Sequence, residues 1–217
     1  MIYNMHKPEG WTSFDIVKKI RSITKEKKVG HGGTLDPFAE GVLIIGTGRD
    51  TKNLSKVAEQ KKTYEAVIQL GSQTDTLDTE GRLVNTMPVP LLNHKQLESI
   101  LSSFKGIYKH KPPMFSAKKI NGTRLYNLAR KNITIEREEI ISNIYNIKLN
   151  TFTDSLVDLS VTCSKGTYIR VLGSDIAEKI GTIGYLIKLV RTGIGDYKIS
   201  DSLSIHKFES QWKSLEN

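Results

Sequence analysis

Apolar residues recur at helical spacing in several parts of the chain. The first such part follows Thr12 and Ser13, either of which can cap a helix. The apolar positions of this helix are Phe14, Ile16, Val17, Ile20 and Ile23. The other segments predicted to be helical are residues 93–104, 124–131 and 167–181. Glycines near two of these ends, Gly106 and Gly181, are typical of helix termini.

Elsewhere the pattern changes to apolar–polar alternation, or to short apolar runs bounded by glycine, as in β-strands. Strands are predicted in this way for residues 41–48, 64–72, 143–152 and 156–164, and a turn at Gly81 leads into another. Strands and helices do not alternate regularly, which favours an α+β fold with a largely antiparallel sheet over a doubly wound one. The chain contains no internal repeat or linker, so we expect one domain over residues 1–217.

Charge and composition narrow the class of partner. The chain has a net charge of +9 and a pI near 9.5, which predicts a polyanionic partner such as nucleic acid. Apolar runs are too short to span a bilayer, and the first residues do not resemble a signal peptide, so we expect no membrane association. Cys163 is the single cysteine and is expected to be buried in a strand, which fits a cytoplasmic protein.

The segment "KVGHGGTLDPFAEGVLIIGTG", residues 28–48, contains a carboxylate in a setting suited to neither helix nor strand, Asp36. Gly32 and Gly33 let the backbone turn or approach a ligand closely, while Pro37 favours an extended conformation before it. We therefore expect Asp36 to lie in a loop that follows the first helix. Two interpretations remain open, a turn aspartate bonded to its own backbone and a carboxylate presented for chemistry.

The sequence motifs of several other kinds of binding site are absent. The glycines around His31 are not followed by the Gly-Lys-Ser/Thr sequence of a P-loop. In "TDTLDTEG", Asp75 and Asp78 are three residues apart, which misses the spacing of an EF-hand and indicates a polar turn. The histidines show no metal-ligand pairing and there is one cysteine, so we expect no metal site.

Basic residues cluster with aromatic residues in two places, a combination that suits splayed, single-stranded RNA bases. Lys61 and Lys62 precede Tyr64. A second cluster surrounds Tyr108, Phe115 and Tyr126, and its cations are Lys109, Lys111, Lys118, Lys119, Arg124, Arg130 and Lys131. Each cluster taken alone is equally typical of a solvated face. Together they favour an RNA-binding surface.

Tyr168 and Arg170 follow later, where a predicted strand gives way to a helix. The guanidinium of Arg170 either lies on the surface or pairs with a distant carboxylate. Asp36 is the carboxylate of interest, because a neighbouring guanidinium would keep it charged.

At this point whole blocks of the sequence resemble the bacterial tRNA pseudouridine synthase B family. They occur in the family's order over about residues 6–197 and include "HKPEGWTSFDIV", "GHGGTLDPFAEGVLIIGTGRDTK", "KTYEAVIQLGSQTDTLDTEG", "PPMFSAKKINGTRLYNLAR", "SKGTYIRVLGSDI" and "LVRTGIGDY". The resemblance implies the pseudouridine synthase catalytic fold with an RNA-binding insertion near residues 105–135. It also implies an isomerase without a cofactor, which converts the T-loop uridine of tRNA, position 55 in tRNA numbering, into pseudouridine. We expect a monomer.

The resemblance also implies roles for individual residues. Asp36 stands at the position of the catalytic aspartate. The positions that match uridine-binding residues are His31 at the flipped base, Tyr64 stacked on it, Arg170 paired with the catalytic carboxylate, and Tyr168 and Leu189 lining the pocket. Lys7 and Pro8 match a pair that packs beneath the site.

Two departures and several alternatives accompany this interpretation. Val190 stands where the family often has arginine, and the C-terminal PUA domain usual in the family is expected to be absent. Attack at C6 of uracil, attack at C1′ of ribose and a glycal route all fit a catalytic aspartate. The alternative functions are a non-catalytic RNA-binding protein or tRNA-folding chaperone of the same fold, a ribonucleoprotein component, and a synthase acting on another RNA.

Overall fold

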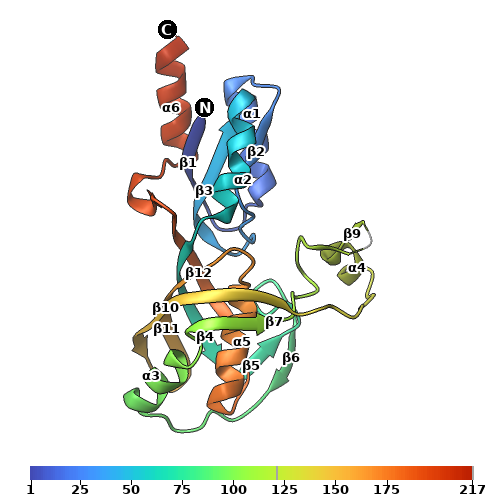
Figure 1. Cartoon of the computed structure of the whole chain (residues 1–217), viewed down its shortest axis with the longest axis vertical. Coiled ribbons are helices and arrows are strands. Elements are labelled where there is room, and N and C mark those ends of the chain that lie inside the picture. Colours follow the sequence, from blue (N-terminus) through green and yellow to red (C-terminus); the bar gives the residue numbers. More distant parts are fainter. Residues whose placement is uncertain (121, 217) are drawn as a thin grey trace. The chain divides into compact units, whose positions relative to one another are not determined.

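The structure is a computed structural model that describes residues 1–120 and 122–216. It mixes helices with a largely antiparallel sheet, which confirms the predicted α+β class (Figure 1). Contacts divide the chain into two compact units. The terminal unit comprises Met1–Tyr64 and the segment from Leu189 onward, and the central unit comprises Glu65–Lys188. A single domain over the whole chain stays a prediction.

The terminal unit is built around strand β3 (Glu40–Thr47). Strands β1 (Ile2–Lys7) and β2 (Val29–His31) pair with β3 antiparallel, whereas the end of β12 (Gly184–Ile194) runs parallel to it. The other elements of this unit are α1 (Ser13–Thr24), η1 (Gly48–Asn53), α2 (Leu54–Glu59), β13 (Tyr197–Lys198), η2 (Ile199–Asp201) and α6 (Ile205–Glu216).

Helix α1 forms where the apolar spacing predicts it. Thr12 and Asp15 make a capping box, which satisfies backbone donors at the start of the helix. Ile16 and Ile20 are fully buried and pack in a core that includes Leu43 of β3. Burial of each such side chain contributes about 1.5–3 kcal/mol. This packing holds α1 against the sheet that carries the loop described below.

The central unit contains a sheet with strand order β12-β4-β11-β10-β7. Helix α3 packs against β10 and α5. The elements of this unit are β4 (Lys62–Leu70), whose first residues belong to the terminal unit, β5 (Ser72–Thr74), β6 (Leu83–Thr86), α3 (His94–Ser102), β7 (Gly106–His110), β8 (Lys119–Ile120), β9 (Thr123–Arg124), α4 (Leu125–Ala129), β10 (Ile140–Phe152), β11 (Leu156–Cys163) and α5 (Ile169–Ile180).

Between β7 and β10 the chain leaves the sheet and forms a small lobe, residues 111–139, which contains β8, β9 and α4. Figure 1 shows this side lobe projecting beside the ends of β7 and β10. It falls largely within the insertion predicted near residues 105–135, whose RNA-binding role stays a prediction.

The predicted helices and strands agree with the structure, apart from small shifts at their ends. Gly181 ends α5 in the left-handed conformation, at φ 97°, as its position predicts. Cys163 is buried in β11, also as expected. None of the helices among the described residues is long and apolar enough to cross a membrane.

Candidate active site

Asp36 lies in the loop between β2 and β3 of the terminal unit and is partly exposed. A turn follows it, in which the Ala39 N–H donates to the Asp36 carbonyl over 3.2 Å. Gly33, with φ 101°, takes a left-handed conformation that side chains disfavour. The predicted loop position of Asp36 is therefore confirmed, and the local geometry is that of a turn.

The guanidinium of Arg191 fixes the backbone on one side of Asp36. It donates from Nη1 to the Thr34 carbonyl (3.0 Å) and from Nη2 to the Gly33 carbonyl (3.1 Å). Its Nε donates to the Val42 carbonyl of β3 over 2.7 Å. Arg191 is only 1% exposed, so these bonds form away from competing water. One buried side chain thus joins the loop to the strand that follows it.

Lys7 fixes the backbone on the other side of Asp36. Its ammonium is fully buried and donates to the Pro37 carbonyl (3.2 Å) as well as to the carbonyls of Pro8 (2.8 Å) and Trp11 (2.7 Å). These contacts support the structural role predicted for Lys7 and Pro8. They also bring a second buried positive charge close to the loop.

Leu35, directly before Asp36, is held by a hydroxyl group. The Ser13 Oγ accepts from the Leu35 N–H (2.9 Å) and donates to the Leu35 carbonyl (3.0 Å). Ser13 is the first residue of α1, so the helix is tied to the loop through this pair. Backbone groups of Thr34, Leu35 and Pro37 are therefore all bonded, which limits the positions that Asp36 can adopt.

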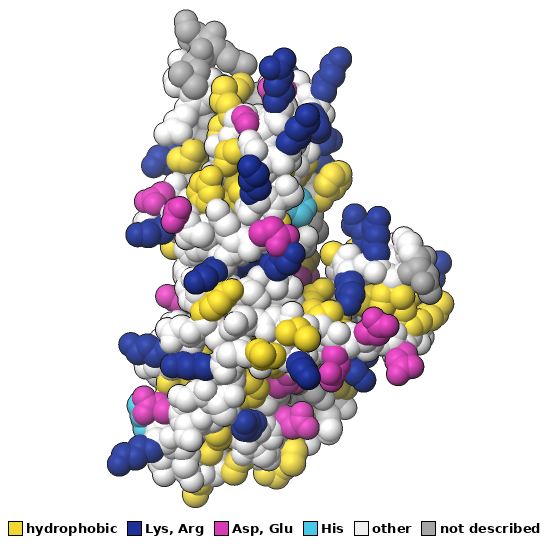
Figure 2. Space-filling view, in the orientation of Figure 1, with side chains coloured by type: hydrophobic (Ala, Val, Ile, Leu, Met, Phe, Trp, Pro, Cys, Tyr) yellow, Lys and Arg dark blue, Asp and Glu magenta, His cyan; other side chains and the backbone are white. Residues whose placement is uncertain are grey.

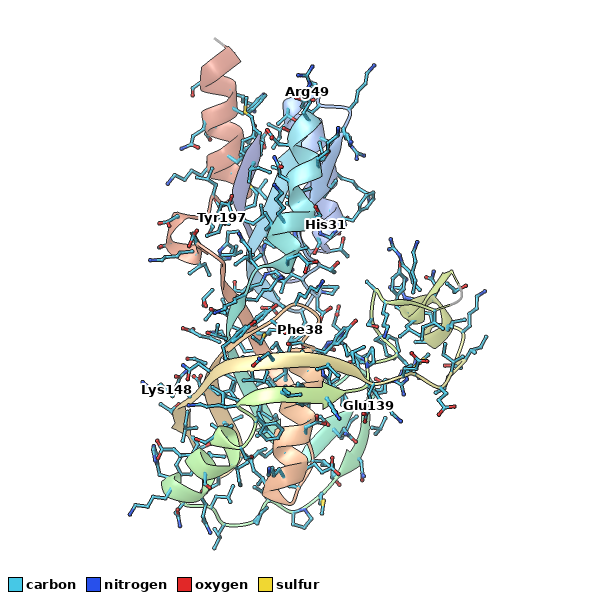
Figure 3. All side chains as sticks on the ribbon, viewed as in Figure 1. His31, Phe38, Arg49, Glu139, Lys148 and Tyr197 are labelled. Atoms are coloured by element: carbon cyan, nitrogen blue, oxygen red, sulfur yellow. The ribbon has the colours of Figure 1, made fainter. Side chains whose placement is uncertain are left out.

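Three other predicted site residues belong to the terminal unit. His31 is half-buried at the end of β2, opposite Ile45 of β3 (Figure 3). Tyr64 is 8% exposed near the start of β4, and Leu189 is 4% exposed in β12. The structure thus places His31, Tyr64 and Leu189 in the same compact unit as Asp36.

Lys61 and Lys62 differ in their surroundings. Lys61 is exposed. Lys62 is only 6% exposed, and its ammonium donates to the carbonyl of Gln60 (2.8 Å), just after α2, and to the carbonyl of Ala58 in the last turn of α2. Lys62 therefore lies beneath the surface on which the sequence predicts it, and there it stabilises the end of α2.

Arg170 lies in the first turn of α5, in the central unit, and forms a buried ion pair with Asp78. Arg170 Nη1 is 3.2 Å from Asp78 Oδ2, and the two side chains are 4% and 3% exposed. The guanidinium also donates to the carbonyls of Thr76 and Phe115, each over 2.8 Å. The acidic run is thus a polar turn, as predicted, and it also holds Arg170. The pairing of Arg170 with Asp36 stays a prediction.

Tyr168 precedes α5 as its N-cap residue and is half-buried. Its ring meets the ring of His110 edge-on, with centroids 6.0 Å apart and planes at 68°. Its position in the chain places it two residues before Arg170. The predicted uridine-pocket residue and the predicted carboxylate partner therefore share one structural junction in the central unit.

The predicted basic surface is largely exposed. Most of its residues belong to the side lobe, and Figure 2 shows Lys and Arg side chains on that lobe. Lys118 is half-buried, and the exposed members are Lys109, Lys111, Lys119, Arg124, Arg130 and Lys131. Tyr126 makes cation–π contacts with two of these cations, since the guanidinium groups of Arg124 and Arg130 lie 5.8 and 5.4 Å from its ring centroid.

Two residues to which the sequence interpretation gave no role in the site have clear roles in the structure. Arg191 stands in the quoted block "LVRTGIGDY". The sequence feature that could have identified it is a cation among apolar residues, since a charged side chain is rarely buried unless it is paired. Asp78 stands in the acidic run, and no spacing within that run distinguishes it from Asp75. Its burial, at 2% exposed, is a tertiary property.

Comparison with known proteins decides the family. Residues 21–169 match the N-terminal domain of TruB family pseudouridylate synthases. tRNA pseudouridine synthase B of Clostridium kluyveri is 47% identical over 210 residues, which cover 97% of this chain and 72% of that protein. The chain belongs to the TruB pseudouridylate synthase family. This confirms the resemblance and the isomerase class expected from it.

A second TruB relative agrees with this assignment, and a solved structure has the same fold. tRNA pseudouridine synthase B of Bacillus subtilis is 43% identical over 219 residues, covering 97% of this chain and 70% of that protein. A chain in the crystal structure of a Cbf5-Nop10-Gar1 complex has the same fold, with a TM-score of 0.79 at 23% identity. That match covers 100% of this chain and 55% of the other, so this chain spans about half of its length.

Proposed function

We propose that this member of the TruB family is a tRNA pseudouridine synthase that isomerises the T-loop uridine, with Asp36 as its catalytic residue. The observation that carries this proposal is the support of the Asp36 loop, where buried Arg191 and Lys7 bind backbone carbonyls on either side. A catalytic carboxylate must be held close to its productive position, and bonds to the neighbouring peptides restrict where it can lie. The tRNA named in the relatives' activity is the substrate proposed here.

The reaction breaks the bond between C1′ of ribose and N1 of uracil and forms a bond between C1′ and C5. The hydrogen on C5 leaves as a proton and N1 gains one, so the reaction is an isomerisation that needs neither oxidant nor reductant. Asp36 serves as an ionised nucleophile or base in attack at C6, attack at C1′ or a glycal route. Tyr64 stacks on the detached base and keeps it in the site while it rotates.

The target uridine must leave the stacked T loop before it can react. Flipping a base costs about a few kcal/mol, which binding energy has to offset. In this proposal His31 engages the flipped uridine, Tyr168 and Leu189 line its pocket, and Arg170 acts near the catalytic carboxylate. Replacing His31 by Ala is expected to slow turnover on folded tRNA more than on a flexible T-loop hairpin. An equal loss on both substrates would argue against a role in flipping.

The side lobe supplies the proposed contact with the tRNA T arm. Its exposed cations suit backbone phosphates, and Tyr126 offers a ring on which a base can stack. Lys61 adds a charge near Tyr64. We further propose that the protein acts as a monomer in the cytoplasm, in keeping with its single buried cysteine.

Tritium release tests the reaction directly. The C5 hydrogen leaves when the C1′–C5 bond forms, so unmodified tRNA carrying tritium at C5 of uridine reports turnover. Wild-type protein is expected to release tritium and Asp36→Asn to release none. Asp196→Asn is the matched control, because Asp196 is an exposed aspartate of the same unit, in the turn between β12 and β13. Bound tRNA without release by the wild type would favour a non-catalytic RNA-binding protein, and equal release by both aspartate variants would overturn the role of Asp36.

A further inference from the structure

His110 lies beneath the junction between β11 and α5, in the central unit. It is only 4% exposed. Its ring stacks on the ring of Tyr108, with centroids 4.4 Å apart and planes at 9°, and Tyr168 contacts it edge-on. Tyr108 and His110 are two residues apart on β7, so both side chains leave the strand on the same face. The stacked pair therefore lies on one face of β7, and His110 contacts the start of α5 from there.

The His110 ring bonds directly to the chain that enters α5. Its Nε2 accepts a hydrogen bond from the Tyr168 N–H over 3.4 Å. An imidazole nitrogen can accept only when it carries no proton, so this bond requires that Nε2 be unprotonated. The carbonyl of Gly166 also lies beside the ring, and a protonated His110 would donate to that carbonyl instead.

Tyr108 gives β7 a second attachment to the same helix. Its hydroxyl donates to Asp175 Oδ2. Asp175 lies in α5, seven residues or about two helical turns after Tyr168. Burial raises the pKa of Tyr108, so its hydroxyl remains a donor at neutral pH. The two rings of β7 thus hold α5 at its start and along its length, on either side of Arg170 in sequence.

We propose that His110 is a positioning residue, whose neutral ring fixes the start of α5 and with it Tyr168 and Arg170. This inference rests on the proposed function, because it assigns to the junction the task of presenting two uridine-binding residues. It adds a residue that neither the sequence motifs nor the proposed site includes. It also makes that arrangement sensitive to pH, because protonation of Nε2 removes the acceptor of the Tyr168 N–H.

The direction of this pH response follows from the surroundings of His110. Burial lowers its pKa, and the charge of Lys118 lowers it further, whereas the carbonyls of Gly166 and Tyr108 act in the opposite sense. The titratable side chains in contact with the ring include Tyr108 and Tyr168, and Asp175 accepts the hydrogen bond of the Tyr108 hydroxyl. Ordinary histidine titrates near 6.5, so the ring should stay neutral at pH 7 and become charged only in more acidic solution.

Nuclear magnetic resonance of the full ¹⁵N-labelled chain tests the contact without relying on activity. The amide resonance of Tyr168 is expected to move in one step in the wild type as the pH is lowered below about 6.5 through the acidic range in which the protein stays folded. In His110→Gln, whose side chain does not titrate, that step should be lost. His94→Gln is the matched control, since His94 is an exposed histidine of the same unit, and it should retain the step. A Tyr168 amide that does not titrate in the wild type would overturn the proposal.

Single-turnover kinetics with T-arm RNA test the positioning role. His110→Phe keeps a stacked ring but has no acceptor, and it is expected to slow turnover by about tenfold to a hundredfold. RNA affinity should change less than twofold, and His110→Gln, which can offer an amide oxygen, should recover most of the rate. Wild-type turnover in His110→Phe would refute positioning. A wild type that is inactive on RNA would refute the proposed function, and the Tyr168 titration would still decide whether the His110 contact exists.

Discussion

Replacing Arg191 by Met should loosen the Asp36 loop while keeping the aliphatic part of the buried side chain. The guanidinium makes three hydrogen bonds, to the carbonyls of Gly33, Thr34 and Val42. Methionine fills a similar volume but cannot donate. The variant therefore separates the bonds from the packing, which arginine also supplies through its methylene groups.

The expected cost follows from these three bonds. A hydrogen bond contributes about 0.5–1.5 kcal/mol net, and one from a charged donor about 1.5–3 kcal/mol. Removing a buried charge offsets part of this loss, because arginine itself had to be desolvated. We expect Arg191→Met to lower the free energy of unfolding by about 2–4 kcal/mol, which leaves a protein of ordinary stability still folded at 25 °C.

Urea unfolding measures the stability change, and single-turnover tritium release at saturating tRNA measures the chemical step. Because the loop carries Asp36, we expect turnover to fall by about a hundredfold in Arg191→Met. Arg191→Lys should be intermediate, since an ammonium lacks the planar fork that reaches separate carbonyls. Lys188→Met is the control for the stability measurement, because Lys188 is an exposed cation on the same strand and should change stability by less than about 0.5 kcal/mol.

A stability change below about 0.5 kcal/mol in Arg191→Met would refute the reasoning that these bonds hold the loop. Loss of stability with unchanged turnover would refute a different step, namely that the backbone bonds position the carboxylate. The two measurements thus test the structural and the catalytic parts of the argument separately.

Three further predictions concern the central unit. Asp78→Asn removes the carboxylate charge that lies 3.2 Å from the buried guanidinium of Arg170 and should lower the free energy of unfolding by about 3–5 kcal/mol in urea titrations; a change under about 1 kcal/mol would contradict the importance of the ion pair. The lowered pKa of His110 means that the unfolded chain binds its proton first, so stability should fall as the pH drops below about 6.5, and His110→Gln should show a smaller fall. Replacing Arg124 and Arg130 together by Ala should weaken tRNA binding and reduce its salt dependence by about two phosphate contacts; an unchanged salt slope would exclude them from the interface.

Local patterns were sufficient to predict much of the secondary structure. The helix after Thr12 and the helix that ends at Gly181 carry both the apolar spacing and the termini that such helices need. Strand β12 was not predicted, because its sequence contains glycine and charged residues at positions whose burial depends on neighbouring strands. Residues 2–7, which form β1, likewise show no regular alternation of polar and apolar side chains.

The candidate site likewise contains some residues that local sequence predicts and others that it does not. Asp36 stood out because its glycine and proline neighbours have strong local preferences. Arg191, which binds the Thr34 carbonyl, lies 157 residues further along the chain. The ion pair between Arg170 and Asp78 likewise joins positions that only the fold brings together. Spacing along the chain contains no information about such contacts, so supporting residues are harder to predict than the residue they support.

The central claim, that Asp36 catalyses formation of pseudouridine in the T loop, is tested most directly by locating the modified nucleotide. Unmodified tRNA is incubated with the wild type, Asp36→Asn or Asp196→Asn, and pseudouridine is mapped along the whole RNA by chemical labelling. We predict one pseudouridine, at the T-loop uridine, with the wild type and Asp196→Asn, and none with Asp36→Asn. Pseudouridine formed by Asp36→Asn at the wild-type rate would contradict the account.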